Sequence, residues 1–158
     1  MSTRCQIAFY ESKPTKAYDF TALLYRHGDG YPGSLRKDDV GILPDIVPTL
    51  RLCYRFLGHR PEYMAAQVVW KMSEIHRESM RDVHLVALKH KEVPPRELLL
   101  GLGVCHEFHY DIDYLYCCRP GYLDCYAVGT KPVDHATRFR DLKKICTVGL
   151  APRGTKRK

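Results

Sequence analysis

The sequence lacks any apolar run long enough to cross a bilayer: the longest, residues 98–105, is far too short. The first residues, Met1 to Cys5, lack the apolar core of a secretory signal peptide. Hydrophobic residues at 45% and charged residues at 27% are ordinary globular values, which excludes wholesale disorder. We therefore expect a cytoplasmic protein without membrane contact. Its 158 residues predict one globular domain over 1–150 and a flexible basic tail over 151–158.

Common catalytic motifs are missing as well. No Gly-rich dinucleotide fingerprint follows a predicted strand, and neither a P-loop nor a G-x-S-x-G nucleophile motif is present. The cysteines are odd in number, seven, and form no Cys-x-x-Cys pair, which argues against a disulfide framework and a zinc site. The nearest approach to ligand spacing is Cys105-His106 with His109, followed by Cys117-Cys118 and Cys125. We assign no cofactor, no metal and no catalytic residue, and interpret the cysteines as small buried hydrophobes.

The charge is unevenly distributed. The formal net charge is +7, and four of the basic residues lie in the last eight positions with no acid among them. Residues 1–150 therefore carry only +3, which is unremarkable for a folded domain. A basic tail adds sequence-independent affinity for phosphate, although such tails also occur simply as solubilising ends.

The order of apolar patterns predicts an α+β fold. We expect a single domain in which an antiparallel sheet of about five strands packs against two main helices plus a C-terminal helix. Turn chemistry separates the predicted elements. They are strands over 4–10, 18–26, 111–118 and 122–128, a weaker strand over 98–104, and helices over 42–56, 61–80 and 135–145.

The most unusual stretch, residues 24–32, is Leu-Tyr-Arg-His-Gly-Asp-Gly-Tyr-Pro. A guanidinium fork beside two glycines suits an anion, because glycine permits close backbone approach. The histidine and aspartate also suggest an oriented imidazole for acid–base work. Alternatively, the aspartate makes a turn, the arginine pairs with a nearby acid and Tyr-Pro packs the loop down. The candidate ligand-binding residues here are Arg26, His27, Gly28, Asp29, Gly30 and Tyr31.

A second candidate lies in the predicted strand 111–118, where alternation places Asp111 and Asp113 on one face. Two carboxylates on a strand suit a divalent cation. They are equally suited to salt bridges with Arg4 or Arg26, or to the solvated side of an antiparallel sheet. We include Arg4 with these two aspartates among the candidate ligand-binding residues.

These stretches, in this order, resemble a group of small, mostly uncharacterised bacteriophage and prophage proteins. Members open with a Thr-Arg-x-x-Ile strand, carry a Tyr-Arg-His-x-Asp-Gly-Tyr-Pro loop and end with an Asp-Ile-Glu-Tyr-Leu-Tyr strand. The resemblance covers residues 2–128, and Asp113 stands where the family usually has Glu. It implies a phage or mobile-element origin, hence the host cytoplasm, and no particular reaction. By analogy, it suggests an inhibitor or modulator of a host defence system such as a CRISPR effector.

Three hypotheses follow. The first is a non-enzymatic binding protein that engages an anionic ligand through the loop at 26–31, helped by Arg4 and the two aspartates. Its partner would be a host protein or nucleoprotein complex, or a phosphate-bearing nucleotide. The alternative is a small metal-dependent phosphoesterase that acts on nucleotides or nucleic acid, with His27 as acid or base. The third is an interaction module whose exposed aromatics form a homo-oligomer interface.

Overall fold

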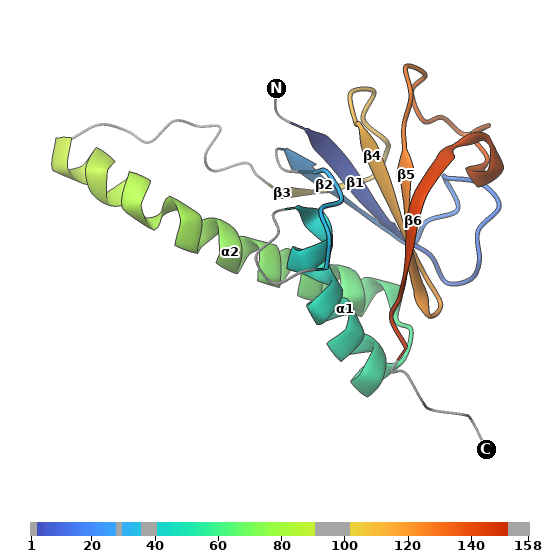
Figure 1. The fold of residues 1–158 in the computed structure, drawn as a ribbon, viewed down its shortest axis with the longest axis horizontal. Helices are drawn as coiled ribbons and strands as arrows, with labels where there is room; N and C mark the ends of the chain where they lie inside the picture. Colours follow the sequence, from blue (N-terminus) through green and yellow to red (C-terminus); the bar gives the residue numbers. More distant parts are fainter. Residues whose placement is uncertain (1–2, 28–29, 36–40, 91–101, 152–158) are drawn as a thin grey trace.

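The computed structural model describes residues 3–27, 30–35, 41–90 and 102–151. Figure 1 shows two helices gathered on one side of a twisted sheet, which is the predicted α+β arrangement. In chain order the elements are strands β1 (Arg4–Phe9) and β2 (Ala22–His27), helices α1 (Ile42–Leu57) and α2 (Pro61–His90), strands β3 (Leu102–Cys105), β4 (Tyr114–Arg119) and β5 (Tyr122–Ala127), the 3-10 turn η2 (Phe139–Asp141) and strand β6 (Lys143–Gly149).

The sheet has six strands in the order β3-β2-β1-β4-β5-β6. Every neighbouring pair is antiparallel except β1 and β4, which run parallel from Cys5 opposite Tyr114 to Phe9 opposite Cys118. The sequence predicted an antiparallel sheet of about five strands. The sheet is mixed because β3 ends level with Ala8 of β1 whereas β4 begins opposite Cys5, so residues 106–113 cross back over the sheet and β4 runs parallel to β1.

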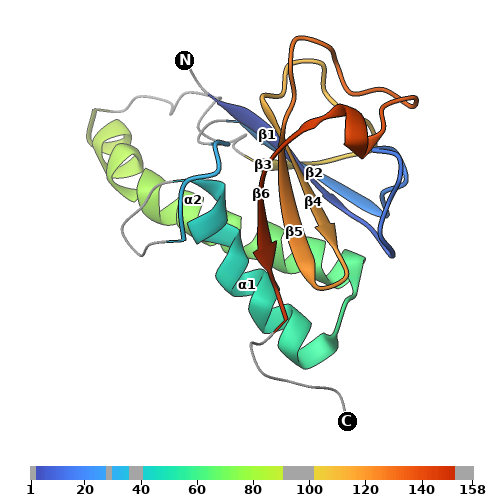
Figure 2. The same cartoon turned by 45° about the vertical axis from the view of Figure 1, so that its right-hand side comes forward.

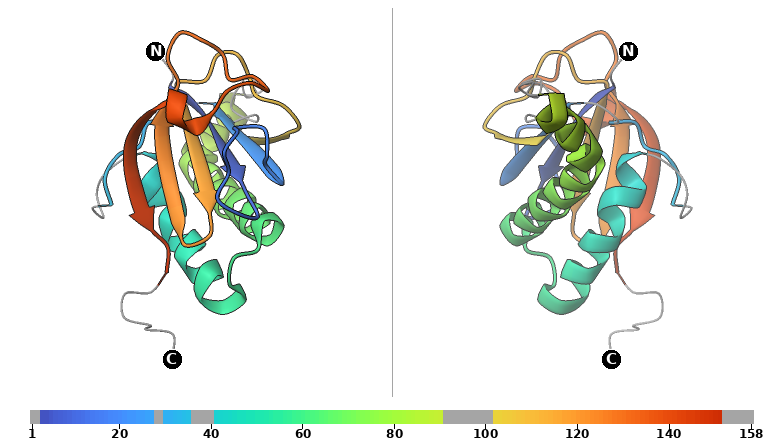
Figure 3. Two further views of the ribbon diagram at one scale, coloured as in Figure 1. Left: turned by 90° about the vertical axis from the view of Figure 1, so that its right-hand side faces the viewer. Right: turned by 90° about the vertical axis from the view of Figure 1, so that its left-hand side faces the viewer.

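The helices bury one face of the sheet (Figure 3). The predicted periodicity of α1 is confirmed, since its buried side chains recur at helical spacing. Pro48 lies inside α1 without ending it. The first core contains, from the helices, Ile42, Ile46, Leu50, Met64 and Val68, and from the strands, Ile7, Phe9, Leu24, Tyr116 and Leu123.

Loops cover the opposite face of the sheet, so that face has its own core. Phe108, Ile112 and Phe139 come from the connecting segments and pack over the strands. Tyr10 extends from the end of β1, and its hydroxyl donates a hydrogen bond of 2.6 Å to the carbonyl oxygen of Ala17. Burial on both faces explains why β1 is buried continuously from Cys5 to Phe9, a pattern typical of a strand covered on both sides.

Several predicted boundaries differ from the structure. The helix predicted over 135–145 is wrong: only η2 forms there, and β6 begins at Lys143. The β-branched residues that follow favour a strand, and β5 offers an open edge to pair with. The strand predicted over 111–118 begins only at Tyr114, so both aspartates precede it. Helix α2 extends ten residues beyond the predicted Met80. Among the described helices, none is both long and apolar enough to span a membrane.

A buried carboxylate joins the last three strands. Asp124 in β5 is 1% exposed. It accepts hydrogen bonds of 2.7 Å from Arg119 Nε and 2.5 Å from the Thr147 hydroxyl, and Lys144 Nζ lies 3.0 Å away. Burial alone would raise the pKa of Asp124, but the hydrogen bonds from these three groups outweigh it and hold the pKa below its usual value. The ionised Asp124 carboxylate therefore fixes β6 to the sheet.

We expect Asp124→Asn to destabilise the protein by about 3 kcal/mol near neutral pH, because it leaves the mostly buried Arg119 and the half-exposed Lys144 without their anion. A folded-state pKa below the unfolded value means that this stabilisation is present above the unfolded pKa and is lost as pH falls through the folded one. Denaturant titrations between pH 7 and pH 2 should thus show the gap between wild type and variant closing in acid. The exposed Asp141→Asn is the matched control, and an equal effect there would contradict this account.

Candidate functional site

The predicted loop begins with Arg26 turned toward the helices. Across the β1–β2 pair Arg26 lies opposite Cys5, which is in the helix-side core. Its Nη1 donates to Oδ2 of Asp45 in α1 at 2.7 Å, and the Arg26 side chain is only 15% exposed. The loop arginine therefore ties the end of β2 to the first turn of α1, as the packing alternative predicted.

Arg4 and the two aspartates do meet, as one of the predicted alternatives had it. Arg4 Nη1 lies 2.5 Å from Asp111 Oδ2, while Asp113 Oδ2 accepts the Arg4 backbone N–H at 2.9 Å. The backbone N–H of Asp113 donates in return to the carbonyl of Arg4. Both carboxylates are thus engaged in holding the start of β1 to the segment before β4. Within the described ranges, no group of three or more His, Cys, Asp or Glu could hold a metal ion.

Gly30 and Tyr31 direct their backbones into the protein. The Gly30 N–H donates to the Thr3 carbonyl, and the Gly30 carbonyl accepts the buried hydroxyl of Tyr116 at 2.9 Å. The Tyr31 carbonyl accepts the N–H of Ile42, one of the first amides of α1 that no helical carbonyl can satisfy. These groups are used within the fold. Gly28 and Asp29 lie outside the described residues.

The predicted residues share one end of the sheet but divide between its two faces. His27 pairs across the strands with Arg4, and Arg26 pairs with Cys5, so alternation places Arg4 and Arg26 on opposite faces. His27 is exposed at the end of β2. The described residues that the sequence named therefore lie at one end of the sheet but on two faces, where they form two separate ion pairs.

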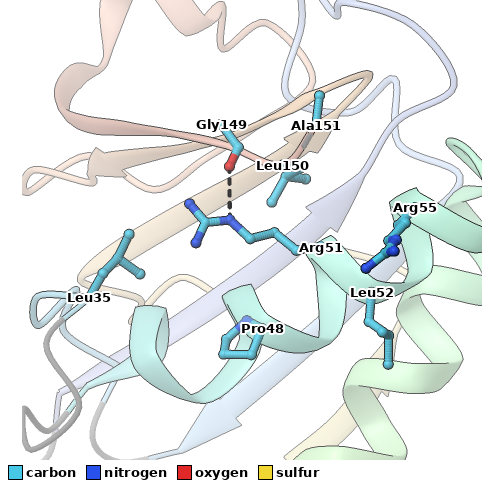
Figure 4. A pocket seen from close by; sticks show the side chains of 8 residues that line it. All are labelled: Leu35, Pro48, Arg51, Leu52, Arg55, Gly149, Leu150 and Ala151. Atoms are coloured by element: carbon cyan, nitrogen blue, oxygen red, sulfur yellow. Dashed lines mark hydrogen bonds between the residues drawn. The ribbon is translucent and has the colours of Figure 1, made fainter. Parts of the chain in front are cut away.

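A groove on a different part of the surface has two arginines and no acid among its described lining residues. It lies between the outer side of α1 and the chain at the end of β6, beside each other in Figure 2, and encloses about 740 Å³. Figure 4 shows Arg51 and Arg55 along α1 at this groove. The remaining lining residues are Leu35, Pro48, Leu52, Gly149, Leu150 and Ala151.

The two groove arginines are held differently. Arg51 Nε donates to the Gly149 carbonyl at 3.1 Å, which links α1 to the end of β6 (Figure 4). The Arg55 guanidinium lies 5.5 Å from the ring centroid of Phe56, and Phe56 is 70% exposed. Neither arginine has an ion pair with a described carboxylate. The groove thus presents two guanidinium groups over an aliphatic floor, a combination that suits carboxylates attached to apolar groups.

The sequence carries a signal for this groove. Beyond Asp45 in its first turn, α1 carries two arginines and no acid. Pro48, Leu52 and Phe56 recur every four residues and form a second apolar stripe outside the buried one. A helix with two apolar stripes is expected to pack against something on each.

A thiol and an imidazole meet at the β3 edge of the sheet, opposite the edge formed by β6. Cys105 Sγ, at the end of edge strand β3, lies 3.5 Å from His109 Nε2. The His109 ring stacks on Tyr25 at 4.4 Å between ring centroids. In the sequence, Cys105 and His109 stood out only as an approach to metal-ligand spacing. Their contact could not be predicted, because it depends on the turn that follows β3.

Comparison with known proteins gives no further guidance: no family model, curated protein or solved structure matches this chain.

We expect Arg26→Ala to lower the free energy of unfolding by about 2 kcal/mol, since a charge-assisted hydrogen bond is lost and Asp45 is left without that partner. Thermal or denaturant melting measures this directly. Arg140→Ala removes an exposed arginine whose ion pair is long, 3.7 Å, and should change stability little. A variant at Arg26 as stable as wild type would return this residue to the list of ligand contacts.

Gly30→Ala should also destabilise the fold by about 2 kcal/mol through overpacking. A Cβ at Gly30 would lie 2.8 Å from the Cys5 backbone nitrogen, whereas a Cβ at Gly103 would meet nothing within 4 Å. Gly103→Ala is therefore the matched control, and urea midpoints of both variants provide the comparison. Equal midpoints would show that Gly30 is not a steric requirement of the loop.

Proposed function

We propose that this chain is a non-enzymatic binding protein that docks an acidic, apolar segment of a partner protein in the groove between α1 and the end of β6. One observation carries the proposal. Arg51 and Arg55, one helical turn apart, border an aliphatic groove whose described lining residues include no acid. The proposal keeps the anionic partner expected from the sequence and moves its main contact away from the loop.

The lining favours a polypeptide over a nucleic acid. Proteins that hold single strands stack bases on aromatic side chains, and the lining residues that the structure describes include none. Leucine, proline and alanine instead offer contacts to aliphatic side chains, while each guanidinium can hold a carboxylate through two parallel hydrogen bonds. An extended or helical segment with leucines beside glutamates or aspartates provides both.

The size and exposure of the groove are adequate for a few side chains. Pockets of 300–1,000 Å³ are typical of sites that hold compact ligands, and this one encloses about 740 Å³. Leu52 is 58% exposed and gains most from being covered. Lasting affinity in such interfaces comes from a few residues of this kind, with arginines prominent among them.

Charge outside the groove supports the same partner. Ala151 lines the groove, and four of the seven residues that follow it in the sequence are basic. Such a basic segment raises the rate at which an acidic partner is captured, and salt weakens the effect. The resemblance to phage proteins suggests that the partner is a host protein, and modulation of host defence is part of this proposal.

The alternative phosphoesterase hypothesis has less support. Its metal ligands were to be Asp111 and Asp113, and both are hydrogen-bonded to Arg4. No observation favours it over binding, and magnesium-dependent turnover of nucleotides would restore it.

The test measures binding of a fluorescent peptide of about 12 residues that alternates glutamate and leucine. We expect Arg51→Glu/Arg55→Glu to weaken binding at least roughly tenfold, because two attractive charge contacts become repulsive. Lys131→Glu/Arg140→Glu makes the same change in net charge at exposed positions away from the groove, and it should leave most of the affinity. Melting curves of both variants verify that they fold.

Three results would contradict the proposal. Equal loss in the two double variants would mean that binding follows net charge alone. Tighter binding of a single-stranded oligonucleotide of similar length, lost in the same groove variant, would replace the protein partner with nucleic acid. Loss of peptide binding in His27→Ala, with the groove variant unaffected, would return the site to the loop.

A further inference from the structure

Cys105 differs from the other cysteines in its surroundings. Five of the seven are buried, and only Cys105 and Cys146 are partly exposed. Cys146 lies opposite Cys125 across β5 and β6, whereas Cys105 Sγ lies within 3.5 Å of the Nε2 atom of His109. A thiol within hydrogen-bond reach of an imidazole is the basic arrangement of a nucleophile and its base.

His109 is held in place through both its ring and its backbone. Its ring stacks on Tyr25 at 4.4 Å with an interplanar angle of 18°. Its backbone N–H donates to Oε1 of Gln6 at 2.9 Å, and Nε2 of Gln6 donates to the Glu107 carbonyl at 3.2 Å. Gln6 is completely buried in β1. A buried amide thus pins the turn that carries His109, and the stack fixes the orientation of its ring.

Space is available beside the thiol. Gly103 precedes Cys105 by two residues, so both lie on the same face of β3. A Cβ at Gly103 would meet nothing within 4 Å, and His106 and His109 are exposed. A small substrate can therefore approach Cys105 over Gly103 without moving the backbone.

We propose that Cys105 is a nucleophilic thiol with His109 as its base, and that it accepts acyl groups from thioesters. Sγ of Cys105 attacks the acyl carbon while the thiol proton passes to Nε2 of His109. The carbon–sulfur bond of the donor then breaks, and the leaving thiolate takes that proton from His109. One thioester is consumed and one is formed on Cys105, with no change in oxidation state.

The electrostatics of the pair require a base at the moment of attack. Burial raises the pKa of the Cys105 thiol, and a hydrogen bond from Gln6 only partly offsets it. The resting sulfur is therefore a thiol rather than a thiolate. For the step above, Nε2 of His109 must be the nitrogen without hydrogen, so that it accepts the proton.

The experiment compares two cysteines in the same molecule. The full-length reduced protein is treated with iodoacetamide, and separately with the acetyl thioester of N-acetylcysteamine, and adducts are located by peptide mass spectrometry. We expect Cys105 to be alkylated roughly tenfold faster than Cys146 and to be the main acetylated residue. His109→Asn should reduce both reactions at Cys105 by at least about tenfold and leave the alkylation of Cys146 unchanged.

His106→Asn is the matched control, because it removes a neighbouring exposed imidazole that has no such contact with the thiol. Melting curves verify that both variants fold. Alkylation of Cys105 no faster than that of Cys146, or an unchanged rate in His109→Asn, would overturn the nucleophile. Alkylation without acetylation of Cys105 would overturn the acyl substrate. Neither outcome bears on the groove, because peptide binding there is measured with other residues.

Discussion

The parallel pairing of β1 with β4 is the contact on which the rest of the fold depends. It joins the three strands β3, β2 and β1 to the three strands β4, β5 and β6, and it is the one strand pairing between these halves. Tyr116 of β4 lies at this seam, contributes to the core under the helices and donates its hydroxyl to the Gly30 carbonyl. Leu115 beside it belongs to the core on the opposite face.

The same seam explains the position of several charged groups. Arg4 at the start of β1 and Asp113 just before β4 bond through both backbone and side chain, so they close the open end of the pairing. Asp124 anchors β6 at the far side of the half that begins with β4. Ion pairs inside the fold therefore fix the ends of strands, whereas Arg51 and Arg55 have no described carboxylate partner.

Much of the fold follows from local patterns in the sequence. The helices α1 and α2 could be predicted because apolar residues recur at helical spacing over many turns, and the β4–β5 hairpin because a Pro-Gly turn separates two apolar runs. The same reasoning wrongly predicted a C-terminal helix over 135–145. Ala136, Phe139 and Leu142 have helical spacing, but Phe139 packs in the loop-side core and β5 recruits the following residues. Tertiary pairing outweighs a short periodic pattern.

The candidate site was harder to predict than the fold. The sequence identified charged residues that lie at one end of the sheet, and the structure shows two ion pairs there, Arg4–Asp111 and Arg26–Asp45. Whether they meet depends on strand register, since a shift of one residue exchanges the two faces. The groove was missed for a different reason. It is formed by α1 and by the chain beyond β6, and no local motif brings elements so far apart in the sequence together.

Folding protects most of the cysteine thiols from chemical reaction, because it buries them. Five thiols lie inside the cores, where burial keeps them from oxidants in solution. Burial raises the pKa of Cys5, Cys117 and Cys118, so these sulfurs are poor nucleophiles while the chain is folded. Unfolding in air exposes seven thiols on one chain, and random cross-links then compete with refolding. We therefore expect the lifetime of this protein outside a reducing solution to follow its unfolding rate rather than its equilibrium stability.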